Sequence, residues 1–279
     1  MAQRELEAGI HTDLRGRLTY SSYLCLDKVL NAQVPIGNPP YHEEMLFIIP
    51  HQTSELWMKL MIHELEAVVK YVQEDRLQPC HALVARVKLI QQQMISSWDV
   101  LQTLTPPEYV QFRVILRGAS GFQSYQYRAL EFMLGNKYDA MADLFAHDPP
   151  IHQWVRAKLE APSLYDEFLR YLARHGHAVP QDRLERDWTQ CYQRSSEVTQ
   201  VIKGIYQNRE MYRDEYELCE LLADLEVNFQ IWRFRHMMTV KKIIGYKSGN
   251  AGSSGVAFLT KALDLVFFPE LFEVKSELA

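Results

Sequence analysis

The sequence predicts an all-α protein, a single helical bundle. Apolar residues recur at the three- and four-residue spacing of a helix along almost the whole chain. Proline starts and glycine stops mark the ends of several of these stretches. No run of β-branched residues alternates with polar ones over a length typical of a strand. With 279 residues, 47% of them hydrophobic, the chain is long enough to bury a sizeable core.

The first periodic stretches predict helices before residue 120. Residues 45–57 (MLFIIPHQTSELW) are interrupted by Pro50, which either disturbs a helix or begins one, because proline lacks the backbone donor. Residues 83–101 place apolar side chains at steps of three, four or seven. Thr105 to Glu108 match a capping box with proline at the first helical position, so a helix over 106–117 follows.

Later stretches continue the helical prediction. Residues 162–176 have a proline start and a glycine stop, and the stretch from about 209 to 244 predicts a helix of unusual length. An apolar helix over 256–268 (VAFLTKALDLVFF) follows the loop GYKSGNAGSSG (245–255). That loop holds four of the twelve glycines. It is either a flexible linker or a segment whose backbone approaches a ligand.

Composition narrows the classes of function. The net charge of -5 and pI near 6.1 argue against general binding to nucleic acid or anionic membranes. The acidic residues among the first seventeen argue against a signal peptide, and MLFII (45–49) is far shorter than the ~20 residues of a membrane span. The four cysteines form no C-x-x-C pair, so we expect reduced thiols and a cytoplasmic protein. The residues 1–15 are expected to be a disordered N-terminal segment, and residues 16–279 one helical domain.

Arg113 breaks the apolar pattern of its predicted helix. Tyr109, Phe112, Arg113 and Leu116 share one face, so a permanent charge lies on the side expected to be buried. Because burying an unpaired guanidinium is costly, an anion should lie against it. The anion is either an Asp or Glu of another helix or the carboxylate of a ligand, which Arg113 and the Tyr109 hydroxyl could hold together.

Two histidines also occupy apolar positions. His236 lies on the stripe of Phe229, Trp232, Val240 and Ile243 where a leucine would be expected. His51 lies one turn after Phe47. Each could be a hydrogen-bonded core histidine. Together, in a helical chain without paired cysteines, they favour a haem pocket between helices.

Motifs of other enzyme classes are incomplete. HELEA (63–67) lacks the second histidine of H-E-x-x-H, and GASGF (118–122) is not G-x-S-x-G. No G-x-G-x-x-G or Walker loop occurs, which argues against hydrolase and nucleotide-binding functions.

Long segments of the chain resemble the tryptophan 2,3-dioxygenase family. The resemblance runs from about residue 16 to 275 and rests on these segments in order: LTYSSYLCLDKVL (18–30), HEEMLFIIPHQTSELWMKL (42–60), SGFQSYQYRALEFMLGN (120–136), WRFRHMMTV (232–240), GSSGV (252–256) and FFPELF (267–272). It implies an all-α homotetramer that binds haem b, with ferrous iron in the active state. It also implies the insertion of both atoms of O2 across the indole C2–C3 bond of L-tryptophan, which gives N-formyl-L-kynurenine.

The resemblance also implies roles for single residues. His236 matches the axial ligand of the haem iron, and His51 the distal histidine that faces the indole N–H. Phe47 matches the aromatic residue beside substrate and haem, while Tyr109 and Arg113 match the carboxylate clamp. The remaining matches are residues that line the site or reach it from a neighbouring subunit: Ser120 and Gly121, and Tyr20, Tyr23 and Leu24.

Two positions depart from the family pattern. Asn250, followed by Ala251, stands where the family has a threonine whose hydroxyl contacts the substrate ammonium. Pro50 stands where a residue that does not interrupt the helix is expected, so a slight tilt of the distal histidine His51 is expected. The sequence leaves three alternative functions to compare. A protein like indoleamine 2,3-dioxygenase is disfavoured by His51, where that relative has serine. A haem-binding sensor without turnover is disfavoured by the complete clamp. A helical bundle with only a structural role would require the polar residues at apolar positions, His51, Arg113 and His236, to be coincidental.

Overall fold

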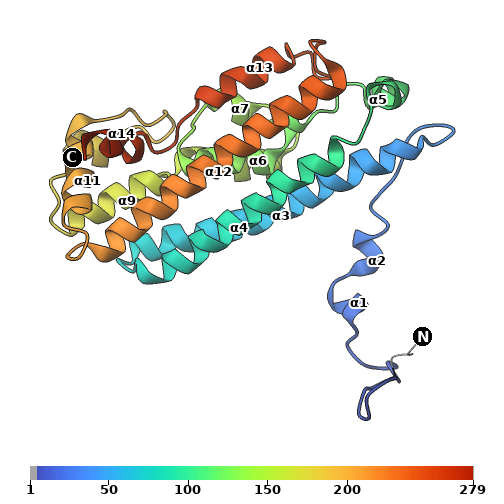
Figure 1. Ribbon diagram of the computed structural model, residues 1–279, viewed down its shortest axis with the longest axis horizontal. Helices are drawn as coiled ribbons and strands as arrows, with labels where there is room; N and C mark the ends of the chain where they lie inside the picture. Colours follow the sequence, from blue (N-terminus) through green and yellow to red (C-terminus); the bar gives the residue numbers. More distant parts are fainter. Residues whose placement is uncertain (1–4, 279) are drawn as a thin grey trace.

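Three long helices lie side by side along the molecule: α3 (His42–Gln73), α4 (Gln78–Leu101) and α12 (Arg213–Ile244). Helix α4 packs against both of the others (Figure 1). The computed structural model describes residues 5–278, and these residues contain helices and loops but no strand. The prediction of an all-α fold is therefore confirmed.

Shorter helices surround this framework. Helix α6 packs on α3 and α8, α9 packs on α3, α13 packs on α12, and α11 packs on α14. Their bounds are α1 (Tyr20–Tyr23), α2 (Leu26–Val29), α5 (Pro106–Arg113), α6 (Tyr125–Leu134), α7 (Asp139–Asp143), α8 (Pro149–Glu160), α9 (Leu164–Arg174), α10 (Gln181–Leu184), α11 (Ser196–Gln207), α13 (Val256–Lys261) and α14 (Pro269–Glu277), with 3₁₀ turns at Val114–Leu116, Gly121–Gln123 and Ala262–Asp264.

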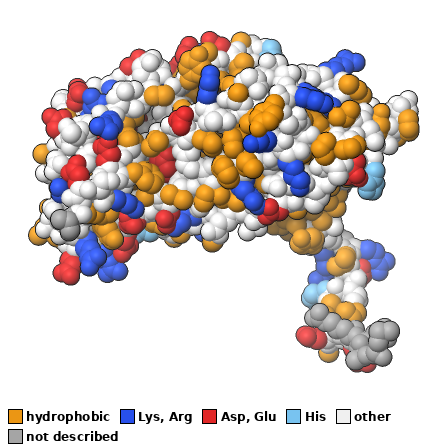
Figure 2. Space-filling model, turned by 45° about the horizontal axis from the view of Figure 1, so that its top comes forward, with side chains coloured by type: hydrophobic (Ala, Val, Ile, Leu, Met, Phe, Trp, Pro, Cys, Tyr) orange, Lys and Arg blue, Asp and Glu red, His pale blue; other side chains and the backbone are white. Residues whose placement is uncertain are grey.

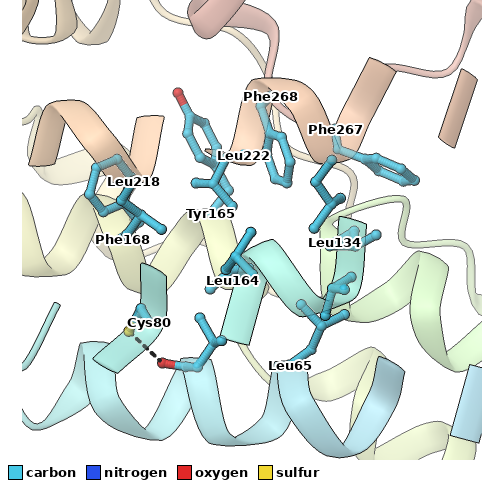
Figure 3. Packing of buried hydrophobic residues seen from close by; sticks show 14 of the residues in the cluster. Leu65, Cys80, Leu134, Leu164, Tyr165, Phe168, Leu218, Leu222, Phe267 and Phe268 are labelled. Carbon is cyan, nitrogen blue, oxygen red and sulfur yellow. Dashed lines mark hydrogen bonds between the residues drawn. The ribbon is translucent and has the colours of Figure 1, made fainter. Parts of the chain in front are cut away.

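The main hydrophobic core lies at the end of the bundle where α9, α11 and α14 meet the long helices. Figure 3 shows side chains of α3, α4, α6, α9 and α12 together with Phe267 and Phe268. Tyr165 and Phe168 of α9 are fully buried there. A second cluster joins α4, α5 and α12 through Trp98, Tyr109 and Phe112, among others. This second cluster supports the candidate site.

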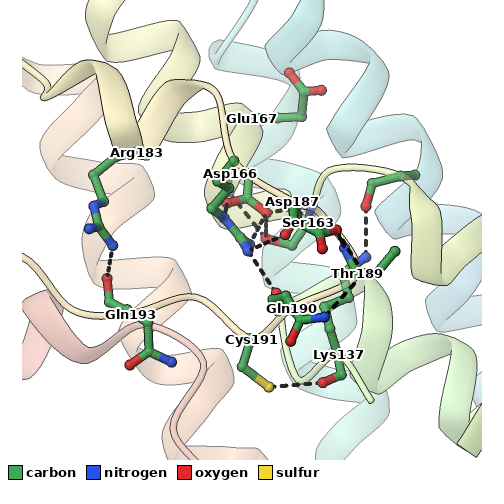
Figure 4. A network of polar contacts seen from close by, with 12 residues as sticks. Lys137, Ser163, Asp166, Glu167, Arg183, Asp187, Thr189, Gln190, Cys191 and Gln193 are labelled. Atoms are coloured by element: carbon green, nitrogen blue, oxygen red, sulfur yellow. Dashed lines mark hydrogen bonds and ion pairs between the residues drawn. The ribbon is translucent and has the colours of Figure 1, made fainter. Parts of the chain in front are cut away.

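A polar network anchors the loop between α10 and α11. Asp166 accepts hydrogen bonds from Arg186 Nε and Nη2, both at 2.8 Å, and from the hydroxyl of Ser163 at 2.7 Å (Figure 4). Lys137 is buried, and its Nζ donates to the carbonyls of Lys158, Leu159 and Ala161 at the end of α8. These contacts join segments that are distant in sequence.

The N-terminal segment projects from one end of the molecule (Figures 1 and 2). Residues 5–15 carry no helix and are exposed, whereas residues 1–4 lie outside the described residues. The segment meets α3 only further along, where the side-chain amide of Gln33 donates to Gln52 at 2.6 Å. None of the helices within residues 5–278 combines the length and apolar character that crossing a membrane requires.

The predicted helices are present, but those predicted over 106–117 and 256–268 end earlier than expected. The sequence predicted a helix over 256–268, whereas α13 and its 3₁₀ turn end at Asp264. Tertiary hydrogen bonds explain the difference. The Leu265 carbonyl accepts from Arg233 Nη1 at 3.0 Å, and the amides of Phe267 and Phe268 donate to the Glu226 carboxylate at 2.8–3.1 Å. These bonds replace the helical ones.

Candidate active site

A cavity of about 590 Å³ lies between the long helices and the loops that cover one side of them. Its volume is in the ~300–1,000 Å³ range of cofactor and small-molecule sites. Helices α3, α4, α5, α6, α12 and α13 contribute to its mostly apolar wall, as do the loops around residues 119–124 and 249–255. The predicted site residues that line it are Phe47, His51, Tyr109, Ser120, Gly121, His236 and Asn250.

His236 projects into the cavity from α12. Its ring stacks on Trp98 with centroids 4.8 Å apart and an interplanar angle of 6°, and Trp232, one turn earlier, lies 5.7 Å away. Burial, with a smaller contribution from His51, lowers the pKa of His236 to about 4. The ring is therefore neutral at pH 7, the state in which imidazole ligates metals.

No hydrogen bond within residues 5–278 engages the imidazole of His236. The indole N–H groups of Trp98 and Trp232 are also buried without a partner in this part of the chain. A neutral imidazole with a free lone pair, sheathed by two tryptophans and facing a large apolar cavity, is suited to an axial metal ligand. These residues therefore fit a haem.

His51 faces the same cavity from α3. Its Nδ1 lies 2.6 Å from the carbonyl oxygen of Phe47, and its ring packs on the Phe47 ring with centroids 4.4 Å apart. Because a carbonyl can only accept, Nδ1 carries the proton and Nε2 keeps its lone pair. Burial lowers the pKa of His51, and the Phe47 carbonyl and Glu55 oppose this. His51 therefore offers an acceptor.

Pro50 does not interrupt the helix that carries His51. Helix α3 begins at His42, and its start is capped by Glu44, whose carboxylate accepts from the Tyr41 amide at 3.3 Å. The helix then continues through Pro50. The hydroxyl of Ser54 donates to the Pro50 carbonyl at 2.7 Å. Of the two sequence alternatives, a helix that begins at the proline is wrong.

Arg113 and Tyr109, on the last two turns of α5, meet the glycine-containing loop at Asn250. Arg113 Nε donates to Asn250 Oδ1 at 3.0 Å, and Asn250 Nδ2 donates to the Tyr109 hydroxyl at 3.1 Å. Arg113 Nη2 also donates to the Ser248 carbonyl. Burial raises the pKa of Tyr109, while the hydrogen bond from Asn250 and the charge of Arg113 lower it in part. The hydroxyl is thus protonated at neutral pH.

The anionic partner expected for Arg113 is not an acidic side chain of the described chain. Within residues 5–278, no Asp or Glu forms an ion pair with its guanidinium, and an amide and a carbonyl take two of its donors instead. Of the two sequence interpretations, the intramolecular carboxylate is therefore excluded for these residues. The guanidinium keeps donors for a ligand carboxylate.

The loop 245–255 is folded rather than extended. Gly249 N–H donates to the Ser253 carbonyl at 3.0 Å, and Gly255 has a φ of +61°. A Cβ at Gly255 would lie 2.5 Å from the Lys247 carbonyl oxygen, so only glycine fits. The need for glycine at position 255 therefore comes from a contact within the loop itself. The linker interpretation is not supported, because the loop docks on α5 and lines the cavity.

Four predicted site residues do not line the cavity. Arg113 is half-buried beside Asn250, to which its Nε donates. Tyr20, Tyr23 and Leu24 lie on the projecting N-terminal segment, where Tyr20 is 76% and Tyr23 73% exposed. Among residues 5–278, no contact brings these three side chains to the cavity.

A buried charged cluster at the cavity wall was not singled out from the sequence. Arg128 of α6 is 9% exposed, pairs with Glu131 and has an Nε without a partner in the described chain. Glu131 also pairs with Arg233 of α12 at 3.4 Å. The available signal was the i, i+3 spacing of Arg128 and Glu131 on a helix face that is otherwise apolar.

Comparisons with known proteins identify similar chains. A family model described as tryptophan 2,3-dioxygenase matches residues 4–148 and 200–278. A tryptophan 2,3-dioxygenase of Myxococcus xanthus is 58% identical over 100% of this chain and 96% of its own length. The tryptophan 2,3-dioxygenase of Serratia proteamaculans is 55% identical over 100% of this chain and 99% of its own length. That of Xanthomonas campestris pv. campestris is 55% identical over 98% of this chain and 92% of its own length.

Proposed function

The chain belongs to the tryptophan 2,3-dioxygenase family, and we propose that its cavity holds haem b through His236 and places L-tryptophan beside it. The protein is an oxidoreductase that inserts both atoms of O2 across the indole C2–C3 bond of L-tryptophan. The product is N-formyl-L-kynurenine, in the first step of tryptophan catabolism by the kynurenine pathway. The family is haem-dependent.

The observation that carries the haem proposal is the neutral, unengaged imidazole of His236 in the cavity wall. His236 would hold the haem iron, and the stacked Trp98 fixes the plane of its ring. Arg128, with a buried Nε that lacks a partner, is suited to a carboxylate of the haem. When bound, the haem iron supplies the oxygen chemistry, and the protein supplies binding and orientation.

The substrate indole is oriented by His51 and Phe47. Neutral His51 accepts the indole N–H at Nε2, because the Phe47 carbonyl holds the proton on Nδ1. His51 acts as an orienting acceptor rather than a base, since an indole N–H is a very weak acid. The Phe47 ring packs within 5.9 Å of Tyr109 and supplies an apolar surface for the indole. Holding the C2–C3 bond in one position converts a rare encounter into a near-attack geometry.

The substrate carboxylate is held by Arg113 and Tyr109. The Arg113 guanidinium has no anionic partner within the described chain, and the Tyr109 hydroxyl stays protonated and can donate. Ser120 and Gly121 line the same cavity and complete the wall around the bound amino acid. The clamp fixes one end of the substrate, while His51 fixes the other.

The active assembly is a homotetramer in which the N-terminal segment completes a neighbouring subunit's site. Tyr20, Tyr23 and Leu24 are exposed apolar side chains on a segment that stands clear of its own bundle. Helix α12 also exposes Val227, Ile231, Phe234 and Met238 at helical spacing. Such apolar surfaces are typical of subunit contacts. The four free cysteines support a cytoplasmic location.

The test is to purify the full chain, add hemin and record the visible absorbance spectrum. We expect a haem absorbance band and, after reduction, consumption of L-tryptophan with appearance of the formylkynurenine absorbance. A protein that stays colourless after addition of hemin would overturn the haem site. A red protein that forms no product from L-tryptophan and O2 would overturn the activity.

A further inference from the structure

Some N–H donors of the Arg113 guanidinium bind the loop 245–255, and the others have no acceptor within residues 5–278. A guanidinium has five N–H groups in a planar fork. The Nε donor goes to Asn250 Oδ1 at 3.0 Å and one Nη2 donor to the Ser248 carbonyl. Both acceptors belong to the loop 245–255, so the loop holds one edge of the fork. The Nη1 donors and the other Nη2 donor remain for a ligand, since no acceptor within residues 5–278 engages them.

Asn250 connects the two residues of the clamp. Because a guanidinium only donates, the Asn250 oxygen must face Arg113, and this orients the amide nitrogen toward Tyr109. The Tyr109 oxygen therefore accepts from Asn250 at 3.1 Å, and its own O–H is left to donate elsewhere. One amide thus engages one donor of Arg113 and one acceptor site of Tyr109.

We infer that Asn250 is a positioning residue that orients Arg113 and Tyr109 for the substrate carboxylate, and that it acts through them rather than on the substrate ammonium. This inference rests on the proposed function. The Asn250 oxygen is engaged by a cationic donor, which makes it a poor acceptor for a second cation. The threonine that the family has here carries its donor and its acceptors on one oxygen, whereas the asparagine amide separates the acceptor and the donor onto two atoms that face Arg113 and Tyr109. Asparagine in place of threonine at position 250 therefore changes the role of this residue from contacting the substrate ammonium to positioning the clamp.

The inference assigns different effects to two partial substrates. Indole-3-propionate keeps the carboxylate but lacks the ammonium, whereas tryptamine keeps the ammonium but lacks the carboxylate. Replacing Asn250 with the isosteric leucine removes both hydrogen bonds to the clamp. If Asn250 positions the clamp, the variant weakens only ligands that carry a carboxylate.

The experiment measures binding of L-tryptophan, indole-3-propionate and tryptamine to the haem-loaded full chain by calorimetry. For Asn250→Leu we expect Kd to rise about tenfold for L-tryptophan and indole-3-propionate, the effect of losing hydrogen bonds to a charged group. Tryptamine should change by less than about twofold. The matched control is Lys247→Ala in the same loop, because the Lys247 side chain is exposed and forms no hydrogen bond within the described residues. It should bind all three ligands as the unaltered protein does.

Asn250→Asp is a second variant that keeps the acceptor for Arg113. Its carboxylate would compete for the guanidinium, so indole-3-propionate should bind more than tenfold more weakly while tryptamine binding is retained. This variant preserves the contact between the loop and α5 and so tests the inference even if the leucine variant does not fold.

Three outcomes would overturn the inference. Weaker binding of tryptamine with unchanged indole-3-propionate would assign Asn250 to the ammonium. Equal weakening of all three ligands would mean general damage to the cavity. Unchanged binding of all three would leave Asn250 without a role. A failure of the proposed function looks different, because the unaltered protein would then take up no haem or would bind no L-tryptophan.

Discussion

Replacing His51 with alanine removes the hydrogen-bond acceptor that we assign to the indole N–H. The loss follows from the geometry at this position. His51 Nδ1 is engaged by the Phe47 carbonyl at 2.6 Å, so only Nε2 can serve the substrate. Leaving a buried N–H without a partner costs ~1–3 kcal/mol. We therefore expect kcat/KM for L-tryptophan to fall by ~10²-fold or less.

The assay compares L-tryptophan with 1-methyl-L-tryptophan, which lacks the N–H. The unaltered protein should prefer L-tryptophan, and His51→Ala should lose most of that preference. His51→Gln is the matched variant, because its amide oxygen can still accept and should restore part of the rate. Complete inactivity of His51→Ala with haem retained would refute an orienting role and indicate a catalytic base.

The same assignment gives a pH dependence. Burial lowers the pKa of His51 below the ordinary value of 6.5. The neutral acceptor is present above that lowered pKa and is lost as the pH falls through it, when Nε2 becomes protonated. We expect kcat/KM to stay level down to pH 6.5 and to decline only below it. The decline should be absent in His51→Gln, and a decline that persists in this variant would contradict the assignment.

Further predictions concern the ligand, the clamp and the fold. His236→Ala should abolish stable haem binding or leave a haem without normal catalysis, and full activity with an unchanged spectrum would disprove ligation. Arg113→Ala should weaken tryptophan binding by ~2–5 kcal/mol, the cost of breaking a buried charge pair. The loss should lie toward the lower end of this range, because Arg113 is only half-buried. An unchanged KM for L-tryptophan would rule out the carboxylate clamp. Asp166→Asn should lower the free energy of unfolding by ~3–5 kcal/mol, since it leaves the largely buried Arg186 unpaired. Denaturant titration measures this, and a loss under ~1 kcal/mol would show that the pair contributes little.

The local pattern of the sequence was sufficient for most helices. The helix start at residue 106 was confirmed, because the capping box and proline act within one turn. The long helix expected from about 209 begins at Arg213 and ends at Ile244. The helix predicted over 106–117 changes to a 3₁₀ turn after Arg113, and Arg117 has a φ of +50°. Helix ends depend on tertiary contacts more than helix interiors do.

The candidate site was only partly predictable. His236 was conspicuous because a polar ring on an apolar stripe is visible in one helix. Arg128 was not, since its burial depends on Glu131 and on contacts from another helix. Trp98 and Trp232 read as ordinary core residues, and only the structure places them around the His236 ring.

Most of the helices, and the chemical groups that they carry, follow from the amino-acid sequence alone, because helical periodicity, caps and residue types act over a few neighbouring positions. Which of these groups meet depends on how the helices and loops pack. The tertiary structure brought His51 and His236 to one cavity, left Arg113 without a carboxylate partner among residues 5–278, and placed Asn250 between Arg113 and Tyr109. The physical reason is that a hydrogen bond or a free donor depends on packing between distant segments, which no local pattern records.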